Sequence, residues 1–148
     1  MKKLSELLSQ CQSVGLNTED ENNQSFSSYA SFYYDGEVVY VSIPSISIHV
    51  TNIEEKPKML ALFIEAATPK KSALERFKAT LECDVSKVSE EDSIFKEIMP
   101  RFEDGALGIL IGTQELALYK LTPTSGEVTY GLGETYAVGG EKMNEVNG

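Results

Sequence analysis

A strict two-residue alternation of apolar and polar side chains sets the fold expectation for this chain. Apolar residues recur at Phe77, Ala79, Leu81, Cys83 and Val85, and polar or charged residues fill the positions between them. Successive side chains of a β-strand point to opposite faces of its sheet. The spacing therefore predicts a half-buried strand with these five residues facing inward.

A second signal lies at Asp35-Gly36, between two β-rich runs over residues 26–34 and 38–43. Asp-Gly favours a tight hairpin, because a type I′ turn needs positive φ at both central residues. Pro44 is expected to end the second strand of this hairpin.

The remaining segments predict further strands joined by short helices. We expect helices over 3–12, 47–55 and 94–99, strands over 59–64, 115–121 and 127–138, a loop over 17–24 and a turn over 122–126. Segment 59–64 is apolar throughout and indicates a strand buried on both faces. The strand over 127–138 would bend at its glycines, and residues 105–112 favour no single structure. Six or so antiparallel strands indicate a mainly β protein, a small barrel forming one domain over 1–148. Its N-terminal helix would lie within 1–14 and a flexible tail within 141–148.

The composition excludes several classes of function. A net charge of −10 over 148 residues repels a phosphate backbone, so no nucleic-acid partner is expected. No apolar run approaches the ~20 residues of a membrane helix, so no membrane segment is expected either. Two cysteines and one histidine are too few for a structural zinc site. The same usage fits a reducing cytoplasm, where we expect the protein to be.

One basic island stands out on this acidic chain, formed by Lys70, Lys71, Arg76 and Lys78. Basic residues on one strand face can bind a phosphate or a carboxylate ligand. The alternative is a solvated strand face with cross-strand ion pairs, for example to Glu65 or Glu82.

Several short motifs, in order along the chain, carry a family resemblance. They are Tyr29-Ala30-Ser31-Phe32, Ser47-Ile48-His49-Val50-Thr51-Asn52-Ile53 with Lys56-Pro57, Leu62-Phe63-Ile64-Glu65, Lys71 with Arg76-Phe77-Lys78-Ala79-Thr80, Leu121-Thr122-Pro123-Thr124-Ser125-Gly126, and Gly131-Leu132-Gly133-Glu134-Thr135-Tyr136 with Gly139. Together they resemble the haem-utilisation branch of the pyridoxamine 5′-phosphate oxidase-like FMN-binding split-barrel superfamily, over roughly Gly15 to Gly140. The resemblance implies a six-stranded split barrel and a homodimer that binds FMN or haem at the subunit interface.

The resemblance also implies a set of cofactor-binding residues. They are Ser47, His49, Asn52, Lys71, Arg76 and Lys78. Ser47, Ile48 and His49 match a Ser-Arg-Lys run that holds the FMN phosphate in flavin-binding relatives, and Ile48 replaces its arginine. Thr51 replaces an arginine that is usual in the haem branch. We expect an anion pocket between the 47–52 helix start and the strand carrying Arg76 and Lys78.

Alternatives remain open for individual residues. Ser47 would cap its helix and His49 would be a partly buried polar residue if neither binds a ligand. His49 is a candidate iron ligand only if haem is bound, and no other metal site is expected. Relatives in the haem branch commonly place a ligand histidine in a C-terminal extension, which residues 141–148 do not match.

The aromatic hairpin can be interpreted in two ways. Its residues are Tyr29, Phe32, Tyr33, Tyr34 and Tyr40. They would form either a wall for a flat ligand or barrel core and dimer interface, where tyrosine is enriched.

No residue set forms a complete acid/base or nucleophile constellation, so the catalytic residues stay unassigned. Three functions remain: a flavin-dependent oxidoreductase, a haem-binding or haem-degrading protein, and a cofactor-free interaction domain with a decayed flavin site. In a flavin enzyme the cofactor supplies the chemistry, so missing catalytic motifs do not exclude the first.

Overall fold

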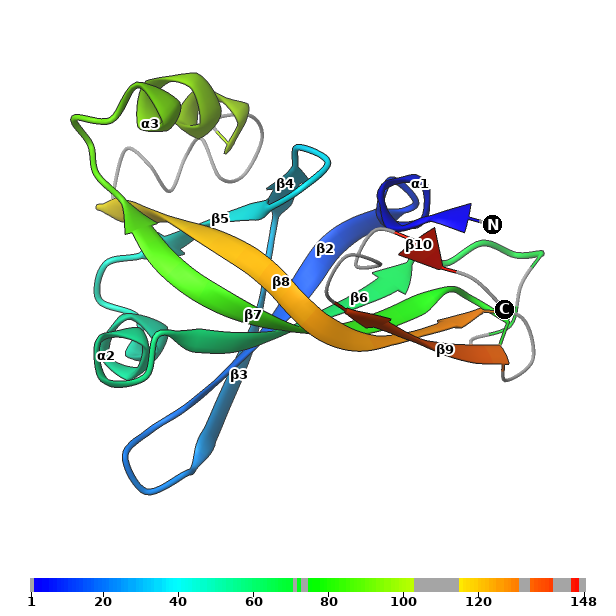
Figure 1. The fold of residues 1–148 in the computed structure, drawn as a ribbon. Helices are drawn as coiled ribbons and strands as arrows, with labels where there is room; N and C mark the ends of the chain where they lie inside the picture. Colours follow the sequence, from blue (N-terminus) through cyan, green and yellow to red (C-terminus); the bar gives the residue numbers. More distant parts are fainter. Residues whose placement is uncertain are drawn as a thin grey trace.

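The computed structural model describes residues 2–70, 72, 75–102, 115–130, 134–139 and 145–146 (Figure 1). The strands are β1 Lys2–Lys3, β2 Cys11–Glu19, β3 Ser25–Ala30, β4 Phe32–Tyr34, β5 Val39–Pro44, β6 Lys58–Glu65, β7 Lys78–Val88, β8 Leu116–Tyr130, β9 Glu134–Gly139 and β10 Glu145–Val146. The helices are α1 Leu4–Leu8, α2 Ile48–Glu55, α3 Ser93–Ile98 and the 3-10 turn η1 Met99–Phe102. No helix among these residues is long and apolar enough to cross a membrane.

The main sheet is antiparallel and closes on itself. Its strand order is β3-β2-β6-β7-β8-β5-β4, and β9 pairs with β8. Only Ser31 separates β3 from β4, so the two ends of this path are consecutive pieces of one chain segment. Counted as one interrupted strand, β3 and β4 give the six strands of a split barrel, to which β9 is added. The mainly β antiparallel barrel predicted from the sequence is confirmed, with eight strands in the sheet rather than six.

The alternation in β7 has the predicted register. Phe77, Ala79, Leu81, Cys83 and Val85 are all buried in the barrel core. Core neighbours come from every barrel strand and from the leucines of α1, which closes one end of the barrel. The inward and outward faces of β7 follow directly from the two-residue period.

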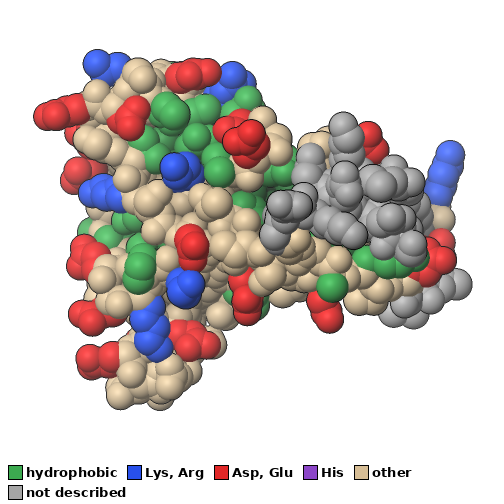
Figure 2. Space-filling view, viewed as in Figure 1, with side chains coloured by type: hydrophobic (Ala, Val, Ile, Leu, Met, Phe, Trp, Pro, Cys, Tyr) green, Lys and Arg blue, Asp and Glu red, His purple; other side chains and the backbone are tan. Residues whose placement is uncertain are grey.

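A second, smaller core lies on the opposite face of β5 and β8, beneath α3 and η1. Its buried residues are Tyr40, Val88, Ile98, Met99, Phe102, Leu116 and Leu118. β5 is therefore buried on both faces. In Figure 2, hydrophobic side chains gather near the top of the view, in the part of the molecule where α3 lies.

Two predictions at the N-terminal end of the chain were wrong in part. The first helix spans only Leu4–Leu8, and β2 extends through residues 17–19 of the segment expected as a loop, whereas residues 20–24 form the expected loop. Buried Val14, Leu16 and Thr18 alternate in β2, so packing of its inner face determines this segment.

The Asp35-Gly36 hairpin is confirmed, since Tyr34 of β4 pairs with Val39 of β5. Its turn is not type I′, because positive φ occurs at Gly36 and not at its non-glycine neighbours. The Asp35 carboxylate instead accepts hydrogen bonds from the Glu37 and Val38 backbone amides.

β6 is a strand as predicted, but only one of its faces is buried. Met59, Ala61 and Phe63 face the core, whereas Leu62 and Ile64 are each 40% exposed on the outer face. An unbroken apolar run predicted burial on both faces, and the single chain leaves the outer face uncovered.

The predicted turn at 122–126 is wrong, because β8 runs through it without interruption. Pro123 pairs with Cys83 where the β7–β8 register shifts, so its missing amide proton is tolerated at a bulge. The single bent strand over 127–138 is instead a hairpin of β8 and β9. Residues 103–114, 131–133 and 140–144 lie outside the described residues, as do the expectations made for them.

Candidate functional site

Ser47 caps the start of α2, as the sequence indicates. Its Oγ accepts a hydrogen bond from the His49 backbone amide at 3.2 Å. Ile46 and Ile48, on either side of it, are 88% and 54% exposed. The start of α2 therefore presents two isoleucines to solvent.

His49 points into the protein and not toward this exposed start. Its side chain is buried, and its ring lies 4.7 Å from that of Phe26, centroid to centroid. Nδ1 is 2.7 Å from Thr18 Oγ1, and Nε2 is 2.8 Å from Ser28 Oγ. Burial lowers the pKa of His49 below its ordinary value, so the imidazole is neutral at pH 7.

Asn52, one turn further along α2, completes this buried polar cluster. Its Nδ2 donates to Thr18 Oγ1 at 3.0 Å. One tautomer then satisfies every group: Thr18 donates its proton to Nδ1 of His49, and Nε2–H donates to Ser28. The cluster joins α2 to β2 and β3, and it uses both ring nitrogens of His49 inside the chain.

Thr18 and Ser28 are members of this cluster that sequence reasoning missed. Thr18 continues the inward alternation of Val14 and Leu16 in β2. That alternation could have identified Thr18 as a buried hydroxyl in need of a partner.

Arg76 and Lys78 lie at the other end of the barrel. Arg76 Nη1 donates to the Glu65 carbonyl oxygen at 3.4 Å, and Lys78 pairs with Ile64 at the end of β6. Lys71 lies outside the described residues.

The structure does not bring the two predicted halves of the anion pocket together within one chain. Asn17 pairs with Leu60, so the adjoining Thr18 and the α2 cluster lie near Met59. Lys78 pairs with Ile64, five residues further along β6. At about 3.3 Å per residue, the two regions are roughly 17 Å apart.

A cleft lies beside the C-terminal end of α2. Its volume is about 590 Å³. It is lined by Asn17, Thr18, Glu19, Glu55, Lys56, Pro57, Lys58, Met59, Leu60, Glu82, Cys83, Asp84 and Thr124. It therefore adjoins the His49 cluster through Thr18.

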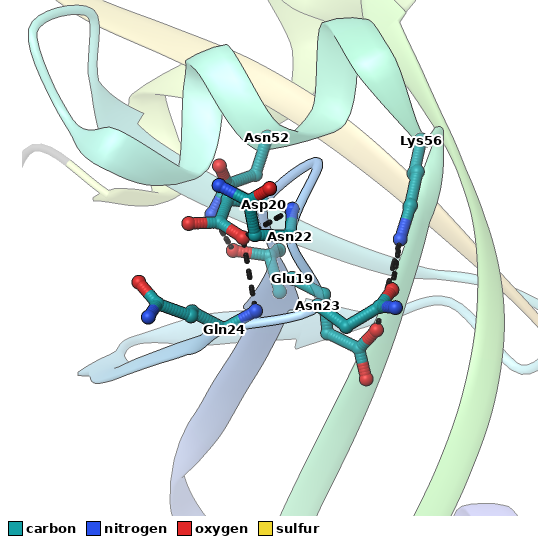
Figure 3. Close-up of polar contacts among 8 residues, drawn as sticks. Glu19, Asp20, Asn22, Asn23, Gln24, Asn52 and Lys56 are labelled. Atoms are coloured by element: carbon teal, nitrogen blue, oxygen red, sulfur yellow. Dashed lines mark hydrogen bonds and ion pairs between the residues drawn. The ribbon is translucent and has the colours of Figure 1, made fainter.

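Lys56, at the end of α2, contacts the β2–β3 hairpin beside this cleft. Its Nζ donates to Asn23 Oδ1 at 2.6 Å and lies 3.8 Å from Glu19 Oε2 (Figure 3). Asp20 in turn holds the β2–β3 turn through hydrogen bonds from the Asn22 and Gln24 amides. The hairpin tip is thus fastened to the end of α2.

The cleft in one chain is acidic. Four carboxylates line it against two lysines. Both lysines are already paired, Lys56 with Glu19 and Lys58 with Asp84, the latter at 3.0 Å. An anionic ligand needs further positive charge before it can bind here.

The aromatic hairpin divides between two environments. Tyr29 is 84% exposed, whereas Phe32 packs edge-on against Phe63 at 5.0 Å. Tyr33 stacks on Tyr40, and the Arg101 guanidinium lies 4.3 Å above the Tyr33 ring. The hairpin is therefore mostly structural, and Tyr29 alone stands free of the core.

Metal-binding clusters and reactive thiols are not evident in the described residues. No group of three or more His, Cys, Asp and Glu side chains in this part of the chain could hold a metal ion. Cys11 and Cys83 are free thiols, and burial raises the pKa of each to about 12.

Comparison with known proteins identifies the fold of this chain. No family model matches the chain. A putative pyridoxamine 5′-phosphate oxidase from Listeria innocua superposes with a TM-score of 0.63 over 93% of this chain and 96% of its own, at 14% identity. The chain has the pyridoxamine phosphate oxidase-like split-barrel fold.

The chain is also similar to the proteins HutZ and ChuZ. Heme oxygenase HutZ of Vibrio cholerae is 25% identical over 144 residues, which cover 95% of this chain and 82% of HutZ. A crystal structure of HutZ, described there as the heme storage protein, gives a TM-score of 0.70 at 23% identity over 88% of this chain and 96% of its own. ChuZ of Campylobacter jejuni gives 0.77 at 24% identity over 97% of this chain. The chain spans only 60% of the length of ChuZ. These likenesses confirm the resemblance to the haem-utilisation branch.

Proposed function

We propose that this protein binds haem in the cleft beside α2, and that a second copy of the chain completes the site. The observation that carries the proposal is the 25% identity to a haem oxygenase over 95% of the chain. The cleft supports it, since about 590 Å³ falls within the range of cofactor sites. Pro57, Met59 and Leu60 give the cleft an apolar side suited to a porphyrin edge.

FMN fits the described residues less well than haem. The FMN phosphate would be expected at the start of α2, where charge-assisted hydrogen bonds are needed. Ile48 is exposed there and His49 is turned inward with both ring nitrogens bonded. The start of α2 therefore offers backbone amides and the Ser47 hydroxyl but no cationic side chain.

The residues predicted as cofactor-binding receive different roles in this proposal. Arg76 and Lys78 would neutralise the haem propionates, reaching the cleft from the second copy. His49 and Asn52 act as positioning residues, because they hold Thr18 at the wall of the cleft. Haem bound there would supply a redox-active iron, while the chain itself holds and orients the ring.

The proposal is tested by titrating haemin and FMN separately into the protein. We expect a Soret band that saturates at one haem per chain or per two chains, and no quenching of FMN fluorescence. Absence of haemin binding would overturn the proposal, and binding of neither ligand would favour the cofactor-free interaction domain.

A matched variant sharpens this experiment. Ile48→Arg places a cation at the start of α2, so we expect it to gain FMN affinity without losing the haemin spectrum. Tight FMN binding by the unaltered chain would favour a flavoprotein instead.

A further inference from the structure

Another cleft lies at the end of the barrel that α1 closes, and we call it the α1 cleft. Its volume is about 420 Å³, which falls within the range of small-molecule sites. Cys11 lines this cleft and Asn17 lines the cleft beside α2, so the two clefts lie toward opposite ends of β2. Residues from α1, from the start of β2 and from the β4–β5 hairpin line the α1 cleft, among them Leu8, Ser9, Gln12, Phe32, Tyr34 and Asp35.

The hairpin wall of the α1 cleft is held in place by hydrogen bonds within the turn. Asp35 Oδ1 accepts from the backbone amides of Glu37 and Val38, each at 2.9 Å. Tyr34 Oη donates to the Gly36 carbonyl oxygen at 3.1 Å. The shape of this wall therefore does not depend on a bound ligand.

The same hydrogen bonds leave acceptor groups of the cleft open. Both turn amides bond to Asp35 Oδ1, and Asp35 Oδ2 has no hydrogen bond or ion pair within the described part of the chain. The Tyr34 and Ser9 hydroxyls donate their protons within the chain, Ser9 to the Glu6 carbonyl oxygen at 2.6 Å, so both oxygens can still accept. The open groups suit a ligand that carries several N–H donors.

The α1 cleft carries negative charge. Asp35 lines it, and no lysine or arginine is among the described residues that do so. The charge acts on Tyr34, whose pKa is raised first by burial and then by the carboxylates of Asp35 and Glu37. Cys11 adds no charge, because burial raises the pKa of its thiol to about 12. A cleft of this kind attracts cations and repels anions.

We propose that the α1 cleft binds a small organic cation, an ammonium or guanidinium compound with a short aliphatic chain. Its charged end donates hydrogen bonds to the Asp35 carboxylate and to the open oxygens of Tyr34 and Ser9. Its aliphatic part lies against Leu8 and Phe32, which give the cleft an apolar side. This site is separate from the proposed haem site and does not rest on it.

Other classes of ligand fit the α1 cleft less well. An anion would meet the Asp35 carboxylate with no cation among the described lining residues to offset it. A metal ion needs several ligating side chains, and the described residues contain no group of three or more His, Cys, Asp and Glu that could hold one. A neutral diol could form hydrogen bonds but would gain no ion pair with Asp35, so it should bind more weakly.

Isothermal titration calorimetry of the full chain with 1,4-diaminobutane tests the proposal. We expect saturable binding of one diaminobutane per chain, and no measurable binding of 1,4-butanediol or succinate, which have the same carbon chain length. Amide NMR shifts should change at Gln12 and Gly36 and stay constant at Lys56, beside the other cleft. Absence of saturable diaminobutane binding, equal binding of the diol, or unchanged shifts at Gln12 and Gly36 would overturn the proposal.

A matched pair of substitutions separates this site from general attraction to an acidic chain. Asp35→Ser removes the charge and keeps an oxygen that can accept from the turn amides. We expect it to weaken diaminobutane binding at least about tenfold, because hydrogen bonds to charged groups are stronger than neutral ones. Asp20→Ser is the control, because Asp20 Oδ1 likewise accepts from two turn amides, at the β2–β3 tip. Equal weakening by both substitutions would refute the site.

Gln12→Lys gives an independent test that leaves the hairpin turn unaltered. Gln12 is exposed and lines the cleft, so a lysine there would place a competing ammonium group in it. We expect Gln12→Lys to abolish diaminobutane binding and to leave the circular dichroism spectrum unchanged. Diaminobutane binding that survives in a folded Gln12→Lys variant would overturn the proposal, because the cation would then lie elsewhere on the chain.

Discussion

Gly126 of β8 lies directly against the backbone of Leu81 in β7, with no room between them for a side chain. A Cβ atom at Gly126 would lie 2.9 Å from Leu81 Cα and closer still to the Thr80 carbonyl oxygen. Both obstacles are backbone atoms, which cannot move without opening the β7–β8 ladder.

Substitution of Gly126 by alanine should therefore destabilise the barrel. We expect Gly126→Ala to lower the free energy of unfolding by about 2–4 kcal/mol, in the range of strained core substitutions. Urea denaturation followed by circular dichroism measures the change. Gly139→Ala is the matched control, because its Cβ would lie 3.4 Å from its nearest neighbour and should cost little. Equal effects of the two substitutions would contradict the close approach.

The buried imidazole of His49 should make stability depend on pH. The folded state keeps His49 neutral, because burial lowers its pKa, whereas the unfolded chain takes up a proton near pH 6.5. The contribution of His49 to the free energy of unfolding is fully present above about pH 6.5. It is lost as the pH falls below that value, by up to about 1.4 kcal/mol per pH unit.

His49→Gln isolates this effect from the carboxylates. The difference in unfolding free energy between the unaltered chain and His49→Gln, measured by urea titration from pH 5 to 8, should shrink as the pH falls. A difference that stays constant over this range would show that His49 has the same pKa in both states.

Two buried hydroxyls should respond oppositely to removal. Thr18 Oγ1 joins His49 and Asn52, so Thr18→Val leaves two buried polar groups unpaired and should cost about 1–3 kcal/mol. Ser42 Oγ is buried with no hydrogen-bond partner, so Ser42→Ala should be neutral or stabilising. Thermal denaturation of both variants measures the contrast. A loss of stability in Ser42→Ala comparable to that in Thr18→Val would show that Ser42 has a partner.

The cysteine thiols should react slowly in the folded protein. Because burial raises the pKa of Cys11 and Cys83 to about 12, almost none of either is thiolate at pH 8. A chromogenic disulfide reagent should label both residues rapidly in urea and only slowly in buffer. Fast labelling of either thiol in buffer would contradict the burial that the structure gives it.

Local patterns in the sequence predicted those parts of the structure that depend on near neighbours. The alternation from Phe77 to Val85 identified both the strand and its inward face, and Ser47 was recognised as a helix cap. The turn predicted at Pro123 was wrong, because a bulge in the β7–β8 ladder accommodates proline inside a strand. No local pattern signals such a bulge.

The candidate site was less accessible to sequence analysis for a topological reason. His49 finds its partners 31 and 21 residues away, at Thr18 and Ser28, so no short motif contains the cluster. Arg76 was expected beside α2, but the length of β6 separates them in one chain. The order of strands in the sheet, and not the spacing in the sequence, determines which of these residues can meet.

At Ser31 the chain passes from β3, which pairs with β2, to β4, which pairs with β5. This change of pairing partner has a consequence for how the barrel forms. The segment from Ser25 to Tyr34 belongs to two local hairpins, one with β2 and one with β5, and each needs only a short loop. The pairings of β2 with β6 and of β5 with β8 join distant parts of the chain, and such contacts form slowly because loop closure is entropically costly. Once both hairpins exist, their shared segment already joins the two ends of the sheet covalently. To close the barrel, β6, β7 and β8 then have to pair between β2 and β5, which the two linked hairpins already keep close to each other.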